Sequence, residues 1–381
     1  MNRAFSYQRR NASCQSLLLR SLLLLVSSAV ASPVAVADHL EQLDEFVVIG
    51  RFPGPPLWKV SRNGNVLWIL PLIDAYPKKM EWDSARVEAL IAQSQEYIER
   101  PLAYRGLAAA KPITMIRISR LSKRSRTLPD GQQLQDVLSP ELYWRFRSLK
   151  DNYLSRDREI ETLRVSAAGS RLQQEILAQE NLETLRYNRG DSPEVITSRL
   201  GKWMKRNNAM RRTSTSYGSI LEVSSRDLKL TEEAMEEAST ISAFASWEVA
   251  CLEKTIAYFE KDIGLVKKRA NAWARGHADD LLDPTPLNGQ GDACNDPPAL
   301  PEDSPAMAKL REEAPGLAAL LLNDRSEAER TSRDRWLAAA EVALANNATT
   351  FSALYIGDIL DTDGPIARLA AKGYVVSISA E

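Results

Sequence analysis

The sequence predicts a mixed α+β fold, in which a small central sheet combines segments from both ends of the chain around a large helical insertion. Three observations support this prediction. A β-hairpin pattern occupies 57–70, a strand, a helix and a strand close the chain over 349–379, and apolar residues recur at helical spacing through about 139–280. The two ends therefore supply the strands, and the middle of the chain supplies most of the helices.

The hairpin consists of two apolar runs, Leu57–Val60 and Val66–Leu70, on either side of a short polar turn. Asn63 and Gly64 in this turn tolerate the positive φ angles that a tight hairpin requires. Because the second run is apolar throughout, we expect it to form a central strand of the sheet.

A helix is expected after the hairpin, with Asp83 or Ser84 as its cap. Two short strands are expected next, at Tyr97–Glu99 and Ile113–Ile118. The interval Lys123–Asp130 that follows is basic and rich in turn-forming residues. The first of the two strands places an acidic side chain, Glu99, at its end.

The helical insertion is expected to end near 280, where the composition changes. A stretch rich in Pro, Gly, Asn and Asp over 283–305 is typical of a surface loop, and helix is expected to resume near Ala306 and again over 332–345. Within the insertion, helices are expected over 142–149, 159–163, 172–185, 193–210 and 230–273.

The end of the chain has a regular pattern of strand and helix. We expect a strand over 349–356, a helix over 364–371 with Gly373 at its C-terminal end, and a final strand over 374–379. The segment Asp361–Gly364 resembles the start of a calcium loop, but the glutamate that such a loop needs twelve residues in is absent, so it is interpreted as a capped helix N-terminus.

The first 37 residues resemble a secretory signal peptide. They contain no acidic residue, four arginines precede or flank a short apolar core at Leu22–Val26, and two A-x-A sites follow. We expect cleavage after Ala37, with Ala31 as the alternative, and a periplasmic location. A membrane anchor is the other interpretation, but spanning a bilayer takes about 20 apolar residues, and serines and a proline interrupt this stretch. The segment 38–56 then forms a short lead.

The composition excludes several classes of function. The net charge is −1 and falls to −5 once residues 1–37 are removed, so the chain lacks the basic field typical of nucleic-acid binding. His39 and His277 are the two histidines, too few for a histidine-based zinc site or a Ser–His–Asp triad. After cleavage two cysteines remain, Cys251 and Cys294, which form a disulfide in an oxidising compartment or stay as separate thiols.

Several short motifs together resemble the TraB/GumN family of extracytoplasmic proteins, whose relatives include the Tiki metalloproteases. The resemblance begins at Leu57–Val60 and its partner strand, continues through Glu99 and Ala272–Gly276, and closes with the strand, helix and strand at Thr350–Val376. It implies one domain over 57–379 that contains the helical insertion. Each motif alone is weak, and their order and spacing carry the assignment.

The family's chemistry, as the resemblance implies it, depends on two Gly-x-x-His motifs that follow two strands and bind a divalent metal. The corresponding segments here end in aspartate, at Pro71–Asp74 and Tyr355–Asp358. The family's Arg-Asn segment is replaced by Arg333-Asp334-Arg335-Trp336, and His277 stands where many members have aspartate. The chain therefore resembles a divergent member that lacks both histidine motifs.

Two interpretations of this site remain open. In one, Asp74 and Asp358 bind Mg²⁺, Ca²⁺ or Mn²⁺ through oxygen, and Glu99 is the base for a metal-bound water, as in a hydrolase of peptidase type. In the other, which the sequence favours, the site is non-catalytic, needs no cofactor, and binds a peptide, a glycan or a partner protein. Aspartate is common in loops after strands because it satisfies local backbone groups, and Pro71 stiffens the first motif.

A third interpretation concerns basic residues around Trp203. They form either a solvated helix face or a surface for an anionic partner such as a membrane, in which case the chain is a structural envelope factor. The cluster comprises Lys202, Lys205, Arg206, Arg211 and Arg212.

Overall fold

The computed structural model describes residues 52–379, apart from 74, 78–79, 81, 110–111, 185–195, 262, 283–293, 295–297, 299, 302 and 323–324. The expected signal peptide, most of the 38–56 lead and most of the 283–305 loop therefore lie outside the described residues. Asp74, one of the two proposed metal ligands, also lies outside them.

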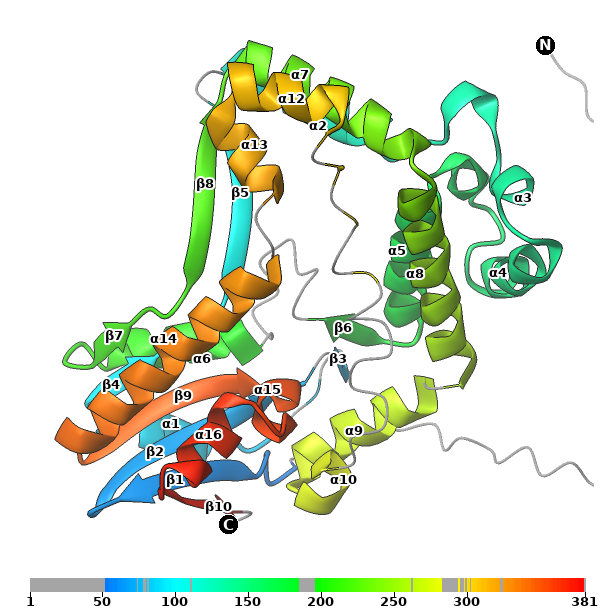
Figure 1. Ribbon diagram of the computed structural model, residues 1–381. Helices are drawn as coiled ribbons and strands as arrows, with labels where there is room; N and C mark the ends of the chain where they lie inside the picture. The colour runs from blue at the N-terminus through cyan, green and yellow to red at the C-terminus, as the bar shows by residue number, and fades with distance from the viewer. Residues whose placement is uncertain are drawn as a thin grey trace, which may run out of the picture. The chain divides into compact units, whose positions relative to one another are not determined.

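A six-stranded mixed sheet joins the two ends of the chain (Figure 1). The strand order is β10-β1-β2-β9-β4-β7, in which β1 runs antiparallel to both of its neighbours, and β2, β9, β4 and β7 are mutually parallel. The predicted fold class is confirmed, with one strand of the sheet, β7, coming from the middle of the chain. The strands are β1 (Leu57–Arg62), β2 (Asn65–Leu72), β4 (Glu96–Ile98), β7 (Arg211–Thr213), β9 (Thr349–Tyr355) and β10 (Val375–Ser379).

The predicted hairpin is present as β1 and β2. Asn63 and Gly64 turn the chain with φ angles of 52° and 85°, which is the conformation that favours these two residues. The apolar strand β2 lies between β1 and β9, so its expected central position is confirmed.

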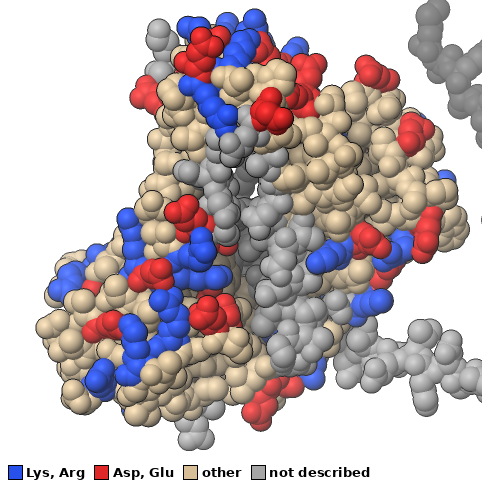
Figure 2. Space-filling view, in the orientation of Figure 1, with Lys and Arg blue, Asp and Glu red and all other residues tan. Residues whose placement is uncertain are grey.

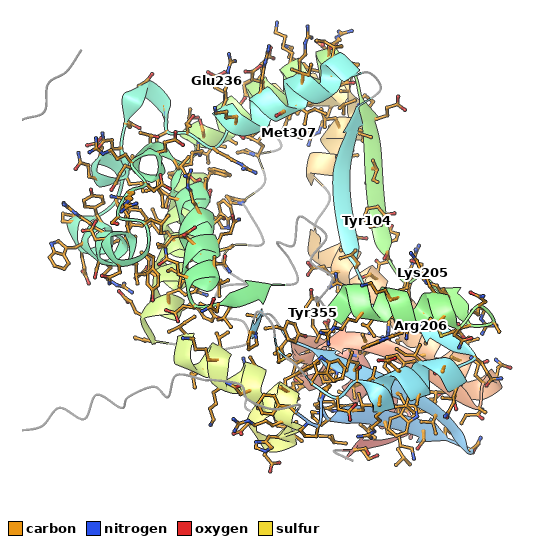
Figure 3. All side chains as sticks on the ribbon, turned by 180° about the vertical axis from the view of Figure 1, so that it is seen from behind. Tyr104, Lys205, Arg206, Glu236, Met307 and Tyr355 are labelled. Carbon is orange, nitrogen blue, oxygen red and sulfur yellow. A yellow bond between two sulfur atoms is a disulfide. The ribbon has the colours of Figure 1, made fainter. Side chains whose placement is uncertain are left out.

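Helices cover both faces of this sheet. The long helix α14 packs on one face together with α15 and α16, and α1 and α6 cover the other face (Figures 1 and 3). Two tryptophans, Trp273 on α9 and Trp336 on α14, are fully buried in the resulting core. The helices are α1 (Ala85–Gln93), α6 (Ile196–Arg206), α9 (Ile263–Arg275), α10 (Ala278–Leu282), α14 (Arg325–Asn346), α15 (Ile356–Leu360) and α16 (Pro365–Ala371).

The insertion has a hydrophobic core of its own, formed mainly by α4, α5 and α8. The buried carboxylate of Glu248 on α8 is satisfied there by Arg164, at 3.0 Å, and by the Ser166 hydroxyl, at 2.6 Å. Cys251 and Cys294 lie at disulfide distance, with Cα atoms 4.8 Å apart, in agreement with the predicted pair. This part comprises η1 (Pro129–Gly131), α3 (Leu134–Val137), α4 (Pro140–Tyr153), η2 (Glu159–Thr162), α5 (Val165–Gln179) and α8 (Ser242–Lys261).

Two smaller sheets complete the described structure. β3 pairs antiparallel with β6, and β5 pairs parallel with β8. The β5–β8 ribbon, which carries Tyr104 in Figure 3, contacts α2, α13 and α14. These elements are β3 (Ala75–Pro77), β6 (Leu182–Thr184), β5 (Ala103–Ala109), β8 (Tyr217–Val223), α2 (Pro112–Arg124), α7 (Ser225–Thr240), α12 (Pro305–Glu313) and α13 (Pro315–Leu322).

One predicted strand is wrong. Residues Ile113–Ile118 belong to helix α2, because helical spacing turns Thr114, Ile118 and Leu121 toward the neighbouring elements and leaves Ile113 outside. The helix expected to reach residue 185 ends at Gln179 and gives way to β6. The long helical stretch 230–273 is divided among α7, α8 and α9.

The C-terminal prediction is confirmed almost residue by residue. Gly364 is the N-cap of α16, and Gly373 follows its C-cap with φ of 83°. On the face seen in Figure 2, basic and acidic side chains are interspersed over α14 and α16. None of the helices in the described part of the chain combines the length and the apolar character that crossing a lipid bilayer requires.

Candidate functional site

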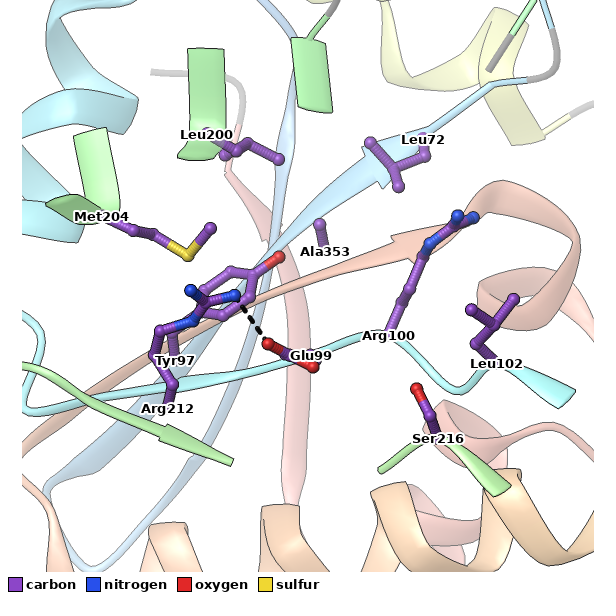
Figure 4. Close-up of a pocket in the computed structure, with 10 residues that line it drawn as sticks. All are labelled: Leu72, Tyr97, Glu99, Arg100, Leu102, Leu200, Met204, Arg212, Ser216 and Ala353. Atoms are coloured by element: carbon purple, nitrogen blue, oxygen red, sulfur yellow. Dashed lines mark hydrogen bonds and ion pairs between the residues drawn. The ribbon is translucent and has the colours of Figure 1, made fainter. Parts of the chain in front are cut away.

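The four parallel strands all end at the same edge of the central sheet. β2 ends at Leu72, β4 at Ile98, β9 at Tyr355 and β7 at Thr213. In sheets with parallel strands, ligands bind beyond the carboxyl ends of the strands. The described residues contain a pocket of about 190 Å³ at this edge (Figure 4).

The pocket has an apolar wall and a polar rim. Leu72, Leu102 and Ala353 come from strand ends or the segments beside them, and Leu200 and Met204 are one helical turn apart on α6. The polar lining residues are Tyr97, Glu99, Arg100, Arg212 and Ser216.

Tyr97 lies in β4 with its ring stacked on Phe351 of β9, at 6.4 Å between ring centroids. Burial, with a smaller contribution from the Glu99 charge, raises the pKa of Tyr97 to about 12 despite the opposing charges of Arg100 and Arg212, so the phenol stays protonated at neutral pH. No described residue forms a hydrogen bond with this hydroxyl, although the side chain is almost fully buried. Because Tyr97 lines the pocket, its hydroxyl offers a hydrogen-bonding group to a ligand there.

Glu99 follows β4 directly and pairs with Arg212, with 2.6 Å between Oε1 and the guanidinium (Figure 4). Its backbone is fixed on both sides, because its N–H donates to the Thr213 carbonyl and its carbonyl accepts from the Thr215 hydroxyl. Arg100 takes a different position, with its guanidinium over the Tyr355 ring at 4.9 Å. The pocket thus carries two guanidinium groups and one carboxylate, an excess of one positive charge.

Asp358 lies in the first turn of α15, just after β9, and does not line the pocket. Its Oδ1 accepts a hydrogen bond from Arg333 Nε at 3.1 Å, and its side chain is 14% exposed. Burial raises the pKa of Asp358 above its usual value, although the Arg333 charge acts in the opposite direction. The second family motif position is therefore occupied by a half-buried ion pair.

The fold places two of the three predicted acids, Asp358 and Glu99, after the adjacent parallel strands β9 and β4, whereas Asp74 lies outside the described residues. Asp358 and Glu99 are described, and each is paired with its own arginine. Among the residues that the structure describes, no cluster of three His, Cys, Asp or Glu side chains is arranged to hold a metal ion.

The Arg333–Asp358 pair bears on whether a divalent cation suits this site. A carboxylate that binds a cation must be ionised and free to coordinate. Here burial favours the protonated form of Asp358, and a guanidinium already provides the positive charge beside it. The described residues therefore do not fit the metal that the family's histidine motifs imply, and the metal-binding roles of Asp74 and Asp358 stay predictions.

Comparison with protein families gives a match to the TraB/PrgY/gumN family model over residues 56–378, which is most of the chain. The chain belongs to the TraB/PrgY/gumN family. Neither the curated proteins nor the solved structures include a match.

The replaced family segment Arg333–Trp336 holds the site of this TraB/PrgY/gumN protein together. Arg335 donates to the Ser216 carbonyl at 3.2 Å, beside the pocket. Trp336 donates from its indole N–H to the Ser352 hydroxyl at 3.1 Å, and that hydroxyl donates to the Ile98 carbonyl. Asp334 also pairs with Arg368 of α16 at 2.6 Å. These four consecutive residues thus contact α15, α16, β9 and the segment that precedes β8.

The family-like segment Ala272–Gly276 has a comparable supporting role. The indole N–H of Trp273 donates to the main-chain carbonyl of Pro71 at 2.7 Å, near the end of β2. Its ring makes edge-to-face contacts with Tyr76 and Trp82. Gly276, with φ of 75°, ends the helix. The segment therefore fixes the strand that leads to the first motif.

Sequence reasoning identified Glu99 but missed Tyr97 and Arg100 as pocket residues. The alternation of side chains along a strand could have identified Tyr97, because Tyr97 and Glu99 are two residues apart and share a face. Arg212 was placed in a basic cluster around Trp203, whereas in this family member it pairs with Glu99. Arg206 and Arg211 of the same cluster pair with Glu88 and Glu96.

Proposed function

We propose that this TraB/PrgY/gumN protein is exported and acts without catalysis, as a receptor that binds a peptide segment through one side chain in the strand-end pocket. The observation that carries the proposal is the pocket itself, which is lined by an aliphatic wall, a tyrosine and two arginines. The N-terminal 37 residues support export, because they combine arginines, an apolar core and small residues in the order of a signal peptide.

The size and chemistry of the pocket favour a peptide over a glycan or a small-molecule cofactor as its ligand. At about 190 Å³ it is smaller than the roughly 300–1,000 Å³ of typical cofactor and small-molecule sites, and it suits a single side chain. Its wall is aliphatic, formed by Leu72, Leu102, Leu200, Met204 and Ala353. A glycan would instead favour a wide polar surface with exposed aromatic rings.

Charge defines the expected ligand further. Arg212 is neutralised by Glu99, whereas Arg100 also lines the pocket, stacks on the Tyr355 ring and has no ion-pair partner among the described residues. A guanidinium binds carboxylates with directed hydrogen bonds. The preferred peptide therefore carries an aliphatic side chain beside a carboxylate, supplied by an acidic residue or a chain terminus.

The non-catalytic part of the proposal is supported by the state of the acids. Asp358 is held by Arg333 and Glu99 by Arg212, so each carboxylate already has a cationic partner. Activation of a water molecule would require one of them to give up its guanidinium and accept a proton.

The test selects peptides from a random library displayed on phage against the purified protein and measures their affinity by fluorescence anisotropy. Arg100→Ala is expected to weaken binding about tenfold, as for the loss of one charged hydrogen bond. Arg62→Ala is the matched control, since Arg62 stacks on Tyr374 at the same 4.9 Å but lies outside the pocket. Failure to select any peptide, or equal affinity for both variants, would contradict the proposal.

The same peptides distinguish the hydrolase alternative. They are incubated with the protein and Mn²⁺, Ca²⁺, Mg²⁺ or Zn²⁺, and the products are analysed by mass spectrometry. The proposal expects intact peptide under all four conditions. Cleavage that is lost in Asp358→Asn would instead assign the site to a metal-dependent peptidase. Cell fractionation and N-terminal sequencing test export, with a mature chain expected to begin at Asp38.

A further inference from the structure

Helix α2 presents an outer face that is cationic and partly apolar. Its sequence from Pro112 to Arg124 contains no acidic residue. The exposed positions include two isoleucines, Ile113 and Ile116, which are 52% and 49% exposed. The cations on the exposed side are Arg117, Arg120, Lys123 and Arg124.

Helical geometry places these residues together. At 100° per residue, Ile113, Ile116, Arg120 and Lys123 follow one another along a single stripe. The opposite side, with Thr114 buried, packs on α7 and β5. In Figure 3, which views the chain from behind, α2 lies on the outside of α7 with side chains projecting away from the ribbon.

The cations of this face are mostly unpaired. Arg124 pairs with Glu232 of α7 at 3.1 Å. For Arg117, Arg120 and Lys123 the described part of the chain supplies no ion-pair partner. Two neighbouring acids of α7 have other partners, since Glu233 binds Lys309 at 2.5 Å and Glu237 accepts from the Ala306 N–H at 2.9 Å. Within the described part of the chain, three of the four cations on this face therefore lack a counter-charge.

We infer that the outer face of α2 binds an anionic phospholipid surface. Exposed aliphatic side chains beside a row of Lys and Arg on a short amphipathic helix are the elements of an interfacial membrane helix. Ile113 and Ile116 enter the boundary between head groups and acyl chains, and Arg117, Arg120 and Lys123 contact lipid phosphates. A soluble acidic partner would be bound by the same charges but gives no reason for two exposed isoleucines beside them.

This face differs from the basic cluster around Trp203. In that cluster three arginines are ion-paired, and the exposed lysines Lys202 and Lys205 remain. The α6 lysines lie on the sheet side of the protein, and no isoleucine lies within four residues of either of them in the sequence. They provide a control of equal charge.

The test is co-flotation of the processed protein with vesicles of phosphatidylcholine and phosphatidylglycerol, and with vesicles of phosphatidylcholine alone. Binding to the anionic vesicles alone is expected. Arg120→Glu with Lys123→Glu should reduce the bound fraction by at least roughly tenfold, whereas Lys202→Glu with Lys205→Glu should leave it unchanged. Circular dichroism confirms that both double variants remain folded.

Three outcomes would overturn the inference. One is absence of the wild-type protein from the floated anionic vesicles. Another is an equal loss of vesicle binding in the two double variants, which would indicate that binding depends only on the net charge of the protein. The third is full retention of binding in Ile113→Ser with Ile116→Ser. Binding to heparin without binding to vesicles would assign the face to a soluble polyanion and would count against the membrane as well.

Discussion

Arg333 Nε lies 3.1 Å from Oδ1 of Asp358, so a guanidinium stands beside the carboxylate that follows β9. In the family pattern this position belongs to a histidine of a Gly-x-x-His motif. The pair explains how an aspartate is tolerated at a half-buried strand end, because burial of a carboxylate is costly unless a partner compensates it.

The replacement Asp358→Asn is expected to stabilise the protein at pH 7. Burial raises the pKa of Asp358 more than Arg333 lowers it, so the folded state favours protonation of this acid more than the unfolded state does. That preference costs stability as pH rises through the folded pKa, and the cost fades as pH falls below the usual aspartate pKa of about 3.9. Urea unfolding at pH 7 and near pH 3 should show a gain at the higher pH and none at the lower. Asp334→Asn, at an exposed pair, should change stability by less than about 0.5 kcal/mol.

Glu96→Gln is expected to destabilise the protein at pH 7, in contrast to Asp358→Asn. Desolvation raises the pKa of Glu96, but hydrogen bonds from Arg211, Thr213 and Asn347 outweigh it and lower the pKa below its usual value. The substitution should cost about 2 kcal/mol at pH 7, as for a hydrogen-bonded charged group. This difference should shrink as pH falls through the lowered pKa, because the wild-type carboxylate is then protonated too. An unchanged difference down to pH 2 would contradict the account.

Reduction of the Cys251–Cys294 pair should lower stability by roughly 4 kcal/mol in the chain-entropy model, given the sequence separation of 43 residues. The measurement compares urea unfolding of the oxidised protein with that of the Cys251→Ser, Cys294→Ser double variant. A loss below about 1 kcal/mol would show that the pair is not bonded or that the reduced state keeps its structure.

Trp336→Phe should destabilise the protein by about 1–3 kcal/mol, because it leaves the buried Ser352 hydroxyl without its indole donor. Trp144→Phe is the matched control, since Trp144 is 74% exposed and should change stability by less than about 0.5 kcal/mol. Equal effects of the two substitutions would rule out a supporting role for Trp336.

The parts of the fold predicted well are those specified by local pattern. The Asn63–Gly64 turn fixed the hairpin, and the Gly364 and Gly373 positions fixed the last helix. Helix α2 was misjudged because its isoleucines suit a strand as well as a helix, and the choice depends on packing against α7 and β5. The short strands β6 and β7 exist through pairing with distant partners, which no local pattern encodes.

The candidate site was predicted in part. Glu99 and Asp358 follow strands that the sequence indicates, and strand order brings their ends to one edge of the sheet. The arginine partners could not be predicted, because Arg212 and Glu99 are 113 residues apart in the chain. The helical periodicity of α6 likewise could not predict that Leu200 and Met204 would line the pocket together with Tyr97.

The most direct test of the proposed receptor function follows the Met204 methyl group, which lies in the pocket wall. Protein labelled with ¹³C at the methionine methyl groups is titrated with a selected peptide and observed by NMR. The account predicts that the Met204 resonance shifts on saturation, whereas those of Met235 and Met307, on α7 and α12, do not. Saturable binding that moves Met235 or Met307 and leaves Met204 unchanged would contradict it.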